Sequence, residues 1–221
     1  IVFPGDLLFM AFSCCPAWSV MAKKLFPEHA KCISMALTPM TLTARLIKQH
    51  NPDARVVFIG PCAAKKLEAM RRSVRSEVDF VLTFEEMTGI FSAKHVDLEN
   101  IEKDPAGVSD ASTDGRNFAV AGGVAQAVVN VIKRDHPDQE IKVANAEGLK
   151  ECRQLLKLAT LGKYPGYLLE GMACPGGCVA GAGTMQAIKK SQTSVGLYAK
   201  QSTHKTSSET EYIKELDKLV D

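Results

Sequence analysis

The stretch Glu170-Gly-Met-Ala-Cys-Pro-Gly-Gly-Cys-Val-Ala-Gly-Ala-Gly-Thr184 is the part of the sequence around which the fold is organised. Two cysteines, Cys174 and Cys178, lie four positions apart in this segment, which also contains five glycines. Glycine adopts positive φ without a steric penalty and lets the backbone approach a bulky ligand closely. A loop of this composition can aim both thiolates at one centre. We therefore interpret it as half of a metal-binding site.

Two further cysteine loops lie upstream, and each contains a proline. Ser13-Cys14-Cys15-Pro16 follows an apolar run at residues 6–12, and Pro61-Cys62 follows the apolar run Arg55–Gly60. Short continuous apolar runs are typical of buried parallel strands. Each loop is therefore expected where a strand gives way to a helix. We predict that one thiolate from each loop joins the pair above in a four-thiolate iron–sulfur site.

Apolar runs and helical periodicity alternate along the chain. Strands are predicted at residues 6–12, 55–60, 78–83, 140–144 and 167–170. Helices are predicted at residues 16–25, 40–49, 63–75, 84–91, 124–134, 149–158, 185–191, 195–200 and 212–219, with a single helical turn at 98–102 in a long surface connection. This alternation predicts an α/β fold, a parallel sheet flanked by helices on both faces. The cysteine loops would lie at the C-terminal ends of strands, where open α/β sheets bind ligands. We expect residues 1–221 to form a single α/β domain.

The composition is that of an ordinary soluble globular protein, with 46% hydrophobic and 24% charged residues. A net charge of +2, without a basic stripe interleaved with aromatics, gives no reason to expect a nucleic-acid partner. No apolar run approaches the roughly 20 residues that cross a bilayer, so no membrane association is expected. Seven cysteines form an odd set in a chain too long to need a disulfide framework. They favour metal binding in a reducing compartment, and we expect a cytoplasmic protein.

Plainer interpretations stay open for these residues. Four thiolates would also suit zinc on count alone, although thiolates scattered over three loops form a cavity rather than a compact zinc knuckle. Cys14 could be a small buried apolar residue, and we interpret Cys32 and Cys152 as core residues. Lys65 could be a solvated lysine on a helix, and Met172 could serve core packing.

Three segments together resemble the signature motifs of iron-only hydrogenases. They are Ser-Cys-Cys-Pro-Ala-Trp at 13–18, Gly-Pro-Cys-Ala-Ala-Lys-Lys-Leu-Glu at 60–68 and Glu-Gly-Met-Ala-Cys-Pro-Gly-Gly-Cys at 170–178. They occur in the family's order and at about its separations, and the elements between them are similar, so the resemblance covers nearly the whole chain. It implies the C-terminal lobe of the H-cluster domain of the large subunit. The implied activity is the reversible oxidation of dihydrogen to protons and electrons.

The resemblance also implies a cofactor. This is the H-cluster, a 4Fe–4S cubane joined through one thiolate to a two-iron centre with carbonyl and cyanide ligands. Cys15, Cys62, Cys174 and Cys178 would hold the cubane, and Cys178 would be the bridging thiolate. Cys14 would be the free thiol that passes protons to the open iron position.

Further roles follow from the same resemblance. Lys65 would hydrogen-bond a cyanide, Pro61 and Met172 would line the apolar pocket around the two-iron centre, and Ser34 would supply a hydroxyl to the proton path. Glu68 matches an acidic position with a supporting role. Backbone N–H groups near Gly176 and Gly177 are expected to hydrogen-bond the cluster sulfurs, one of the interactions that set a cluster's potential.

The sequence departs from the family pattern at three places. Phe12 stands where the prototype has a small hydroxyl residue, and Ala182 stands where it has a glycine. Gly60 stands where the prototype has methionine, which would leave room over the two-iron centre. Such departures resemble less-studied branches of the family, including sensory members. A hydrogen or redox sensor and a hydrogenase-like iron–sulfur cluster carrier or assembly protein are therefore alternative functions.

The family's catalytic domain has two lobes, whereas this sequence starts about a dozen residues before the first motif. We therefore expect the chain to be the C-terminal lobe alone, largely free of cluster when isolated. The N-terminal lobe of the same protein would be its first partner. The resemblance also implies ferredoxin or a similar electron carrier, and cluster maturation proteins, as partners.

Overall fold

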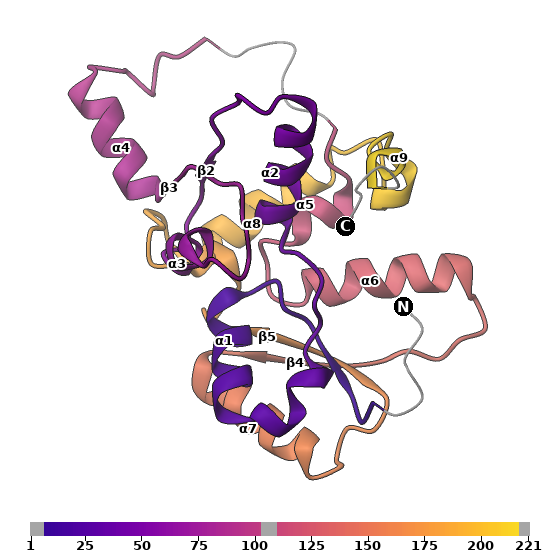
Figure 1. Cartoon of the computed structure of the whole chain (residues 1–221). Helices are drawn as coiled ribbons and strands as arrows, with labels where there is room; N and C mark the ends of the chain where they lie inside the picture. Colours follow the sequence, from indigo (N-terminus) through magenta and orange to yellow (C-terminus); the bar gives the residue numbers. More distant parts are fainter. Residues whose placement is uncertain (1–6, 103–109, 217–221) are drawn as a thin grey trace.

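Two small parallel sheets, each with helices packed around it, form the framework of the chain (Figure 1). The computed structural model describes residues 7–102 and 110–216. Its strands are β1 (Met10–Ala11), β2 (Val57–Ile59), β3 (Phe80–Leu82), β4 (Lys142–Glu147) and β5 (Tyr167–Met172). Its α-helices are α1 (Pro16–Leu25), α2 (Pro39–His50), α3 (Ala64–Met70), α4 (Phe84–Ala93), α5 (Thr113–Asn117), α6 (Gly123–Asp135), α7 (Leu149–Thr160), α8 (Ile188–Ala199) and α9 (Ile213–Leu216). Short 3-10 helices are η1 (Pro27–Cys32), η2 (Cys178–Ala180) and η3 (Ser207–Glu209).

The first sheet has the order β1-β5-β4, with all strands parallel. Successive side chains of a strand point to opposite faces, and the two fully buried residues Leu168 and Leu169 of β5 show this directly. Leu169 packs in a cluster with Trp18 of α1 and Leu156 of α7, whereas Leu168 packs with Val124 of α6. Helices therefore cover both faces of this sheet (Figure 1), as the sequence predicted.

The second sheet contains only β2 and β3, which are also parallel. Figure 1 shows these strands grouped with α3 and α4, apart from the first sheet. Val57 and Ile59 of β2 are each 45% exposed, and Phe80 of β3 is 61% exposed. The parallel pairing and the α/β class are confirmed, but the strands divide between two sheets. The expectation that 55–60 is a fully buried strand is wrong, because one face of β2 is uncovered.

The helices follow the predicted positions with a few differences. Helix α3 ends at Met70 rather than near residue 75, and the loop beyond it places Arg75 and Glu77 at positive φ, which ends helical geometry. The two short helices predicted at 185–200 are one helix, α8. Residues 98–100 form bends and residues 101 and 102 are irregular, so the helical turn predicted at 98–102 is not found. The last residues of the predicted C-terminal helix lie outside the described residues.

Within the described residues, none of the helices combines the length and hydropathy required to cross a bilayer.

Candidate metal centre

All three cysteine loops begin at the C-terminal end of a strand. Cys14 and Cys15 follow β1, Cys62 follows β2, and the loop with Cys174 and Cys178 follows β5. This is the predicted strand-end placement. It brings together loops from both sheets, so the site lies between them.

The second and third loops touch through their backbones. The N–H of Gly183 donates a hydrogen bond to the carbonyl oxygen of Pro61 at 2.9 Å. A Cβ added at Gly181 would lie 2.3 Å from the same oxygen, so no other residue fits there without moving the loops. Ala182, which replaces a glycine of the family pattern, is exposed. Its methyl group therefore leaves the packing of the two loops unchanged.

The four predicted ligand thiols lie within electrostatic reach of one another. The pKa of Cys178 is raised to about 11, first by burial and then by the negative charges of Cys62, Cys15 and Cys174, while Lys65 lowers it. Burial also raises the pKa of Cys174, again with Cys62 and Cys15 as the next causes. Each of the three loops therefore contributes sulfur to one group. Thiolates held this close repel one another, and a bound cation or cluster removes that repulsion.

The arrangement does not suit a single metal ion. Among residues 7–102 and 110–216, no three His, Cys, Asp or Glu side chains are placed to hold one. Structural zinc needs four ligands at about 2.0–2.3 Å from one ion, which these thiols do not provide. An iron–sulfur cluster instead offers a separate iron to each cysteine. Four cysteines grouped from three loops are the ligand set of such a cluster.

A cavity of about 680 Å³ adjoins the thiol group. Five of the predicted site residues line it: Cys14, Pro61, Lys65, Met172 and Cys178. The pKa of Cys14 is raised to about 12, first by burial and then by the nearby charges of Glu170, Cys15 and Cys178, while Lys65 lowers it. Much of the remaining lining is apolar, including Phe58 and Ile59 of β2 and Val124 of α6. The chain thus places a free thiol and a lysine in one largely apolar chamber.

Lys65 does not face the cavity unpaired. Its ammonium donates to a carboxylate oxygen of Glu68 at 2.7 Å, and the residues are 8% and 5% exposed. Both lie on α3, which begins two residues after Cys62. Glu68, predicted in a supporting role, is therefore the immediate partner of the lysine.

Two predicted features are not found as expected. The hydroxyl oxygen of Ser34 accepts a hydrogen bond from the N–H of Ala36, and Ser34 is not among the described residues that line the cavity. The N–H of Gly176 donates to Glu147 at 2.6 Å, and that of Gly177 donates to the carbonyl of Cys174. Both N–H groups therefore donate within the protein, and hydrogen bonds from this part of the backbone to cluster sulfurs stay a prediction. Their positive φ values, 100° and 91°, do confirm the need for glycine.

Sequence reasoning missed a buried carboxylate beside the thiols. Glu170 is 1% exposed and accepts hydrogen bonds from the N–H groups of Gly122 and Ala125, each at 2.7 Å. Burial raises the pKa of Glu170, and these two hydrogen bonds oppose the rise. Glu170 opens the third motif, but its partners lie more than 40 positions away along the chain, so no local pattern could reveal the contact.

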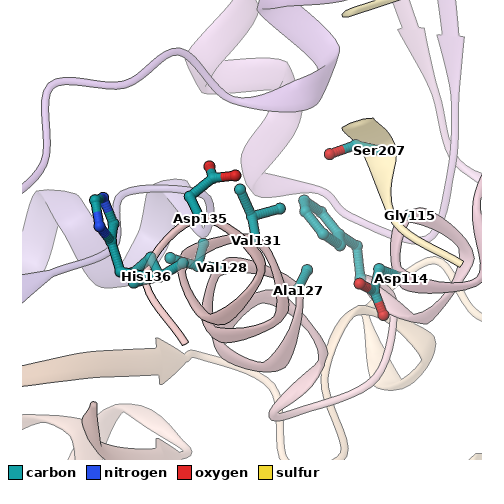
Figure 2. A pocket seen from close by; sticks show the side chains of 10 residues that line it. Asp114, Gly115, Ala127, Val128, Val131, Asp135, His136 and Ser207 are labelled. Carbon is teal, nitrogen blue, oxygen red and sulfur yellow. The ribbon is translucent and has the colours of Figure 1, made fainter. Parts of the chain in front are cut away.

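A second, smaller pocket of about 260 Å³ lies between α5, α6 and η3 (Figure 2). Its floor is apolar, with Phe118, Val128 and Val131, and Figure 2 shows Asp114 and Asp135 at its rim. The carboxylate of Asp114 accepts from Asn130, and that of Asp135 accepts from Arg134. None of the described residues that line this pocket is a cysteine, and it shares Gly115 and Phe118 with the lining of the larger cavity.

Comparison with known proteins agrees with the motifs. The sequence matches the family described as "Iron only hydrogenase large subunit, C-terminal domain" over residues 3–182. The periplasmic Fe hydrogenase large subunit of Nitratidesulfovibrio vulgaris is 28% identical over 77% of this chain and 50% of its own length. Iron hydrogenase 1 of Clostridium pasteurianum is 27% identical, covering 79% of this chain and 37% of that protein. The chain thus spans half or less of these relatives' length.

Other matches extend the comparison. Cytosolic iron-sulfur assembly component 3 of Pongo abelii is 27% identical over 79% of this chain and 46% of its own length. Among solved structures, a variant of FeFe-hydrogenase HydA1 from Chlamydomonas reinhardtii matches with a TM-score of 0.73 and 21% identity, covering 96% of this chain and 71% of that one. At this identity the structural match establishes the fold alone.

Proposed function

Since the chain belongs to the iron-only hydrogenase large-subunit family, matching its C-terminal domain, we propose that it forms part of an enzyme that reversibly oxidises dihydrogen to protons and electrons. The observation that carries the proposal is the placement of Cys14, Lys65 and Cys178 on one cavity, next to the other three motif thiols. An iron–sulfur cluster held by the four thiols alone would not need an adjoining cavity lined by a free thiol and a lysine.

In this proposal Cys15, Cys62, Cys174 and Cys178 hold the 4Fe–4S cubane. Cys178 would be the bridging thiolate to the two-iron centre, which would carry carbonyl and cyanide ligands. Among the four thiols, only Cys178 is found in the described lining of the cavity, which supports this assignment. When bound, the cluster supplies the redox-active, electron-accepting centre at which dihydrogen is split.

The protein's own residues have distinct tasks around this centre. Cys14, in the same chamber as Cys178, holds a proton and passes it on. Lys65 supplies positive charge near a group of anionic ligands, which matters because an unpaired charge in a dry site is costly. Pro61 and Met172 form apolar wall and exclude water. For Ser34 to take part in the proton path, another part of the protein must connect its hydroxyl to the cavity.

The N-terminal lobe of the same protein remains the proposed first partner. The open face of the β2–β3 sheet supports it, because a two-stranded sheet with large apolar side chains exposed is not expected to be stable alone. The single-lobe assignment of residues 1–221, the ferredoxin-like electron carrier and the cluster maturation proteins belong to the same proposal. A cytoplasmic, reducing location is also part of the proposal, because it keeps the cysteine thiols reduced and able to bind iron.

Infrared spectroscopy tests the proposal after maturation of a longer protein that contains this chain. Metal-bound carbonyl and cyanide bands, together with hydrogen uptake or evolution, are the expected result. Absence of these bands from a protein with a full cubane would overturn the hydrogenase and sensor assignments alike. Bands without appreciable turnover would favour the sensor.

Iron–sulfur cluster assembly or transfer is the second candidate. The match to cytosolic iron-sulfur assembly component 3 favours it. Cys14 separates the two functions, because a proton-relay thiol has no purpose in a cluster carrier. A matured protein whose hydrogen turnover is lost in Cys14→Ala, with its iron content kept, would exclude the assembly function.

A further inference from the structure

Gly60 has no conformational need to be glycine. Its φ is not positive, so the backbone there suits any L-residue. The obstacle is a neighbour, because a Cβ added at Gly60 would lie 2.8 Å from Cε1 and 2.9 Å from Cζ of the Phe58 ring. No backbone atom lies as close to that position. The ring of Phe58 thus occupies the space that a side chain at position 60 would take.

The strand geometry explains why these two residues compete. Residues two apart on a strand point to the same face, so Phe58 and Gly60 face the cavity together, and both line it. Val57 and Ile59 alternate with them and are each 45% exposed; Val57 is not among the described residues that line the cavity, whereas Ile59 also reaches its lining. Gly60 itself is buried, and its N–H is fixed to the carbonyl of Leu82 at 3.0 Å. The ring is therefore held over a rigid strand end, directly before Pro61.

We propose that Phe58 is a specificity-determining residue that forms the cavity wall above Gly60 and limits the size of the molecules that reach Cys14 and Cys178. The sequence predicted extra room in the cavity at residue 60, because glycine has no side chain. In the structure, the ring of Phe58 occupies that room. Phe58 and Gly60 act as a compensating pair, in which the larger side chain comes from two residues earlier. The identity of the small molecule as dihydrogen rests on the proposed function, but the wall itself does not.

Thiol labelling in the cluster-free chain tests the wall. The chain is treated with iodoacetamide, which is small, and with fluorescein-maleimide, which is bulky, and labelling of Cys14 and Cys178 is followed by peptide mass spectrometry. Phe58→Ala should speed labelling by the bulky reagent severalfold and labelling by the small reagent much less. Phe58→Ala combined with Gly60→Met should return the rate towards that of the unchanged chain.

Two controls belong to this experiment. Val57→Ala, on the opposite face of the same strand, should leave both rates unchanged. Labelling of Cys62, which is not among the described cavity-lining residues, reports general loosening in the same sample. Equal rates with and without the Phe58 ring, or a rise at Cys62 that matches the rise at Cys14, would overturn the proposal.

A double-mutant cycle tests the pairing independently. Gly60→Ala should lower the denaturant midpoint of unfolding, because the new Cβ meets the ring. The same change made in Phe58→Ala, or in the milder Phe58→Leu, should have a much smaller effect. Additive midpoint shifts would contradict the compensating pair. Neither experiment uses a bound cluster, so failure here leaves the proposed function untouched.

Discussion

The ammonium of Lys65 lies 2.7 Å from the carboxylate of Glu68, and both side chains are buried on the helix that follows the second cysteine loop. A buried ion pair depends on both partners, since removal of one leaves an uncompensated charge in a poorly hydrated place. The lysine is therefore held in position before any cluster binds.

Removal of the carboxylate should be costly. We expect Glu68→Ala to lower the free energy of unfolding by about 3 kcal/mol, within the range for breaking a buried pair. Urea unfolding of the cluster-free chain measures it. The matched control is Lys66→Ala, one residue along, whose partner Glu86 forms a much more exposed pair. Equal losses in the two variants would show that the Lys65 pair is not buried in solution.

The hydrogen bonds that Glu170 accepts should hold the start of α6 against β5. Glu170→Ala leaves the N–H groups of Gly122 and Ala125 without acceptors, and each unsatisfied buried donor costs about 1–3 kcal/mol. We expect faster amide hydrogen exchange at the start of α6, together with a lower free energy of unfolding. Glu147→Gln, an exposed side chain that accepts from Gly176, is the control. Unchanged exchange at 122–125 in Glu170→Ala would refute this role.

The carboxylate of Asp79 should make the free energy of unfolding depend on pH in the acid range. Its carboxylate accepts from the Val56 N–H and pairs with Lys48 and Arg55, and these contacts lower its pKa to about 2 from an ordinary 3.8. Because the folded pKa lies below the unfolded one, the stabilisation is complete above the ordinary pKa. It is lost as pH falls from about 5 towards 2.

Asp79→Asn removes this titration. Unfolding midpoints of the two proteins should differ most near neutral pH and converge as pH falls towards 2. A difference that stays constant over that range would mean that the Asp79 carboxylate does not titrate with folding.

The contact between the second and third loops should tolerate no side chain at residue 181. Gly181→Ala puts a Cβ 2.3 Å from the Pro61 carbonyl oxygen, and overpacking of this kind typically costs about 1–3 kcal/mol. It should also lower the iron bound after reconstitution, because the two loops carry three of the four thiols. Ala182→Gly, next in sequence but exposed, should change neither quantity. Similar effects of the two substitutions would argue against the contact.

Local patterns predicted much of this fold. The apolar runs before the cysteine loops mark real strand ends at β1, β2 and β5, and Pro16 begins α1 because a first helical turn needs no N–H from it. The division into two sheets could not be predicted, since strand pairing depends on contacts between distant segments. The exposure of Val57 and Ile59 was missed for the same reason.

The positions of the three cysteine loops could be predicted from the motifs. The contacts made by other residues of the candidate site could not. The convergence of the three loops followed from their common place at strand ends. The buried position of Glu170 and the ring of Phe58 over Gly60 are tertiary contacts, with no local signature. Ser34 was assigned from its distance along the sequence to Cys15. That distance does not determine where the hydroxyl points, and the hydroxyl accepts from Ala36 instead.

Iron content after anaerobic reconstitution with ferrous iron and sulfide most directly tests the claim that four thiols from three loops hold one cluster. In a longer protein that contains this chain, the unchanged site should bind about four irons. Cys15→Ala, Cys62→Ala and Cys174→Ala should each lose most of that iron, whereas the buried Cys32→Ala should keep it. Full iron binding by Cys62→Ala, or equal loss in Cys32→Ala, would contradict the claim.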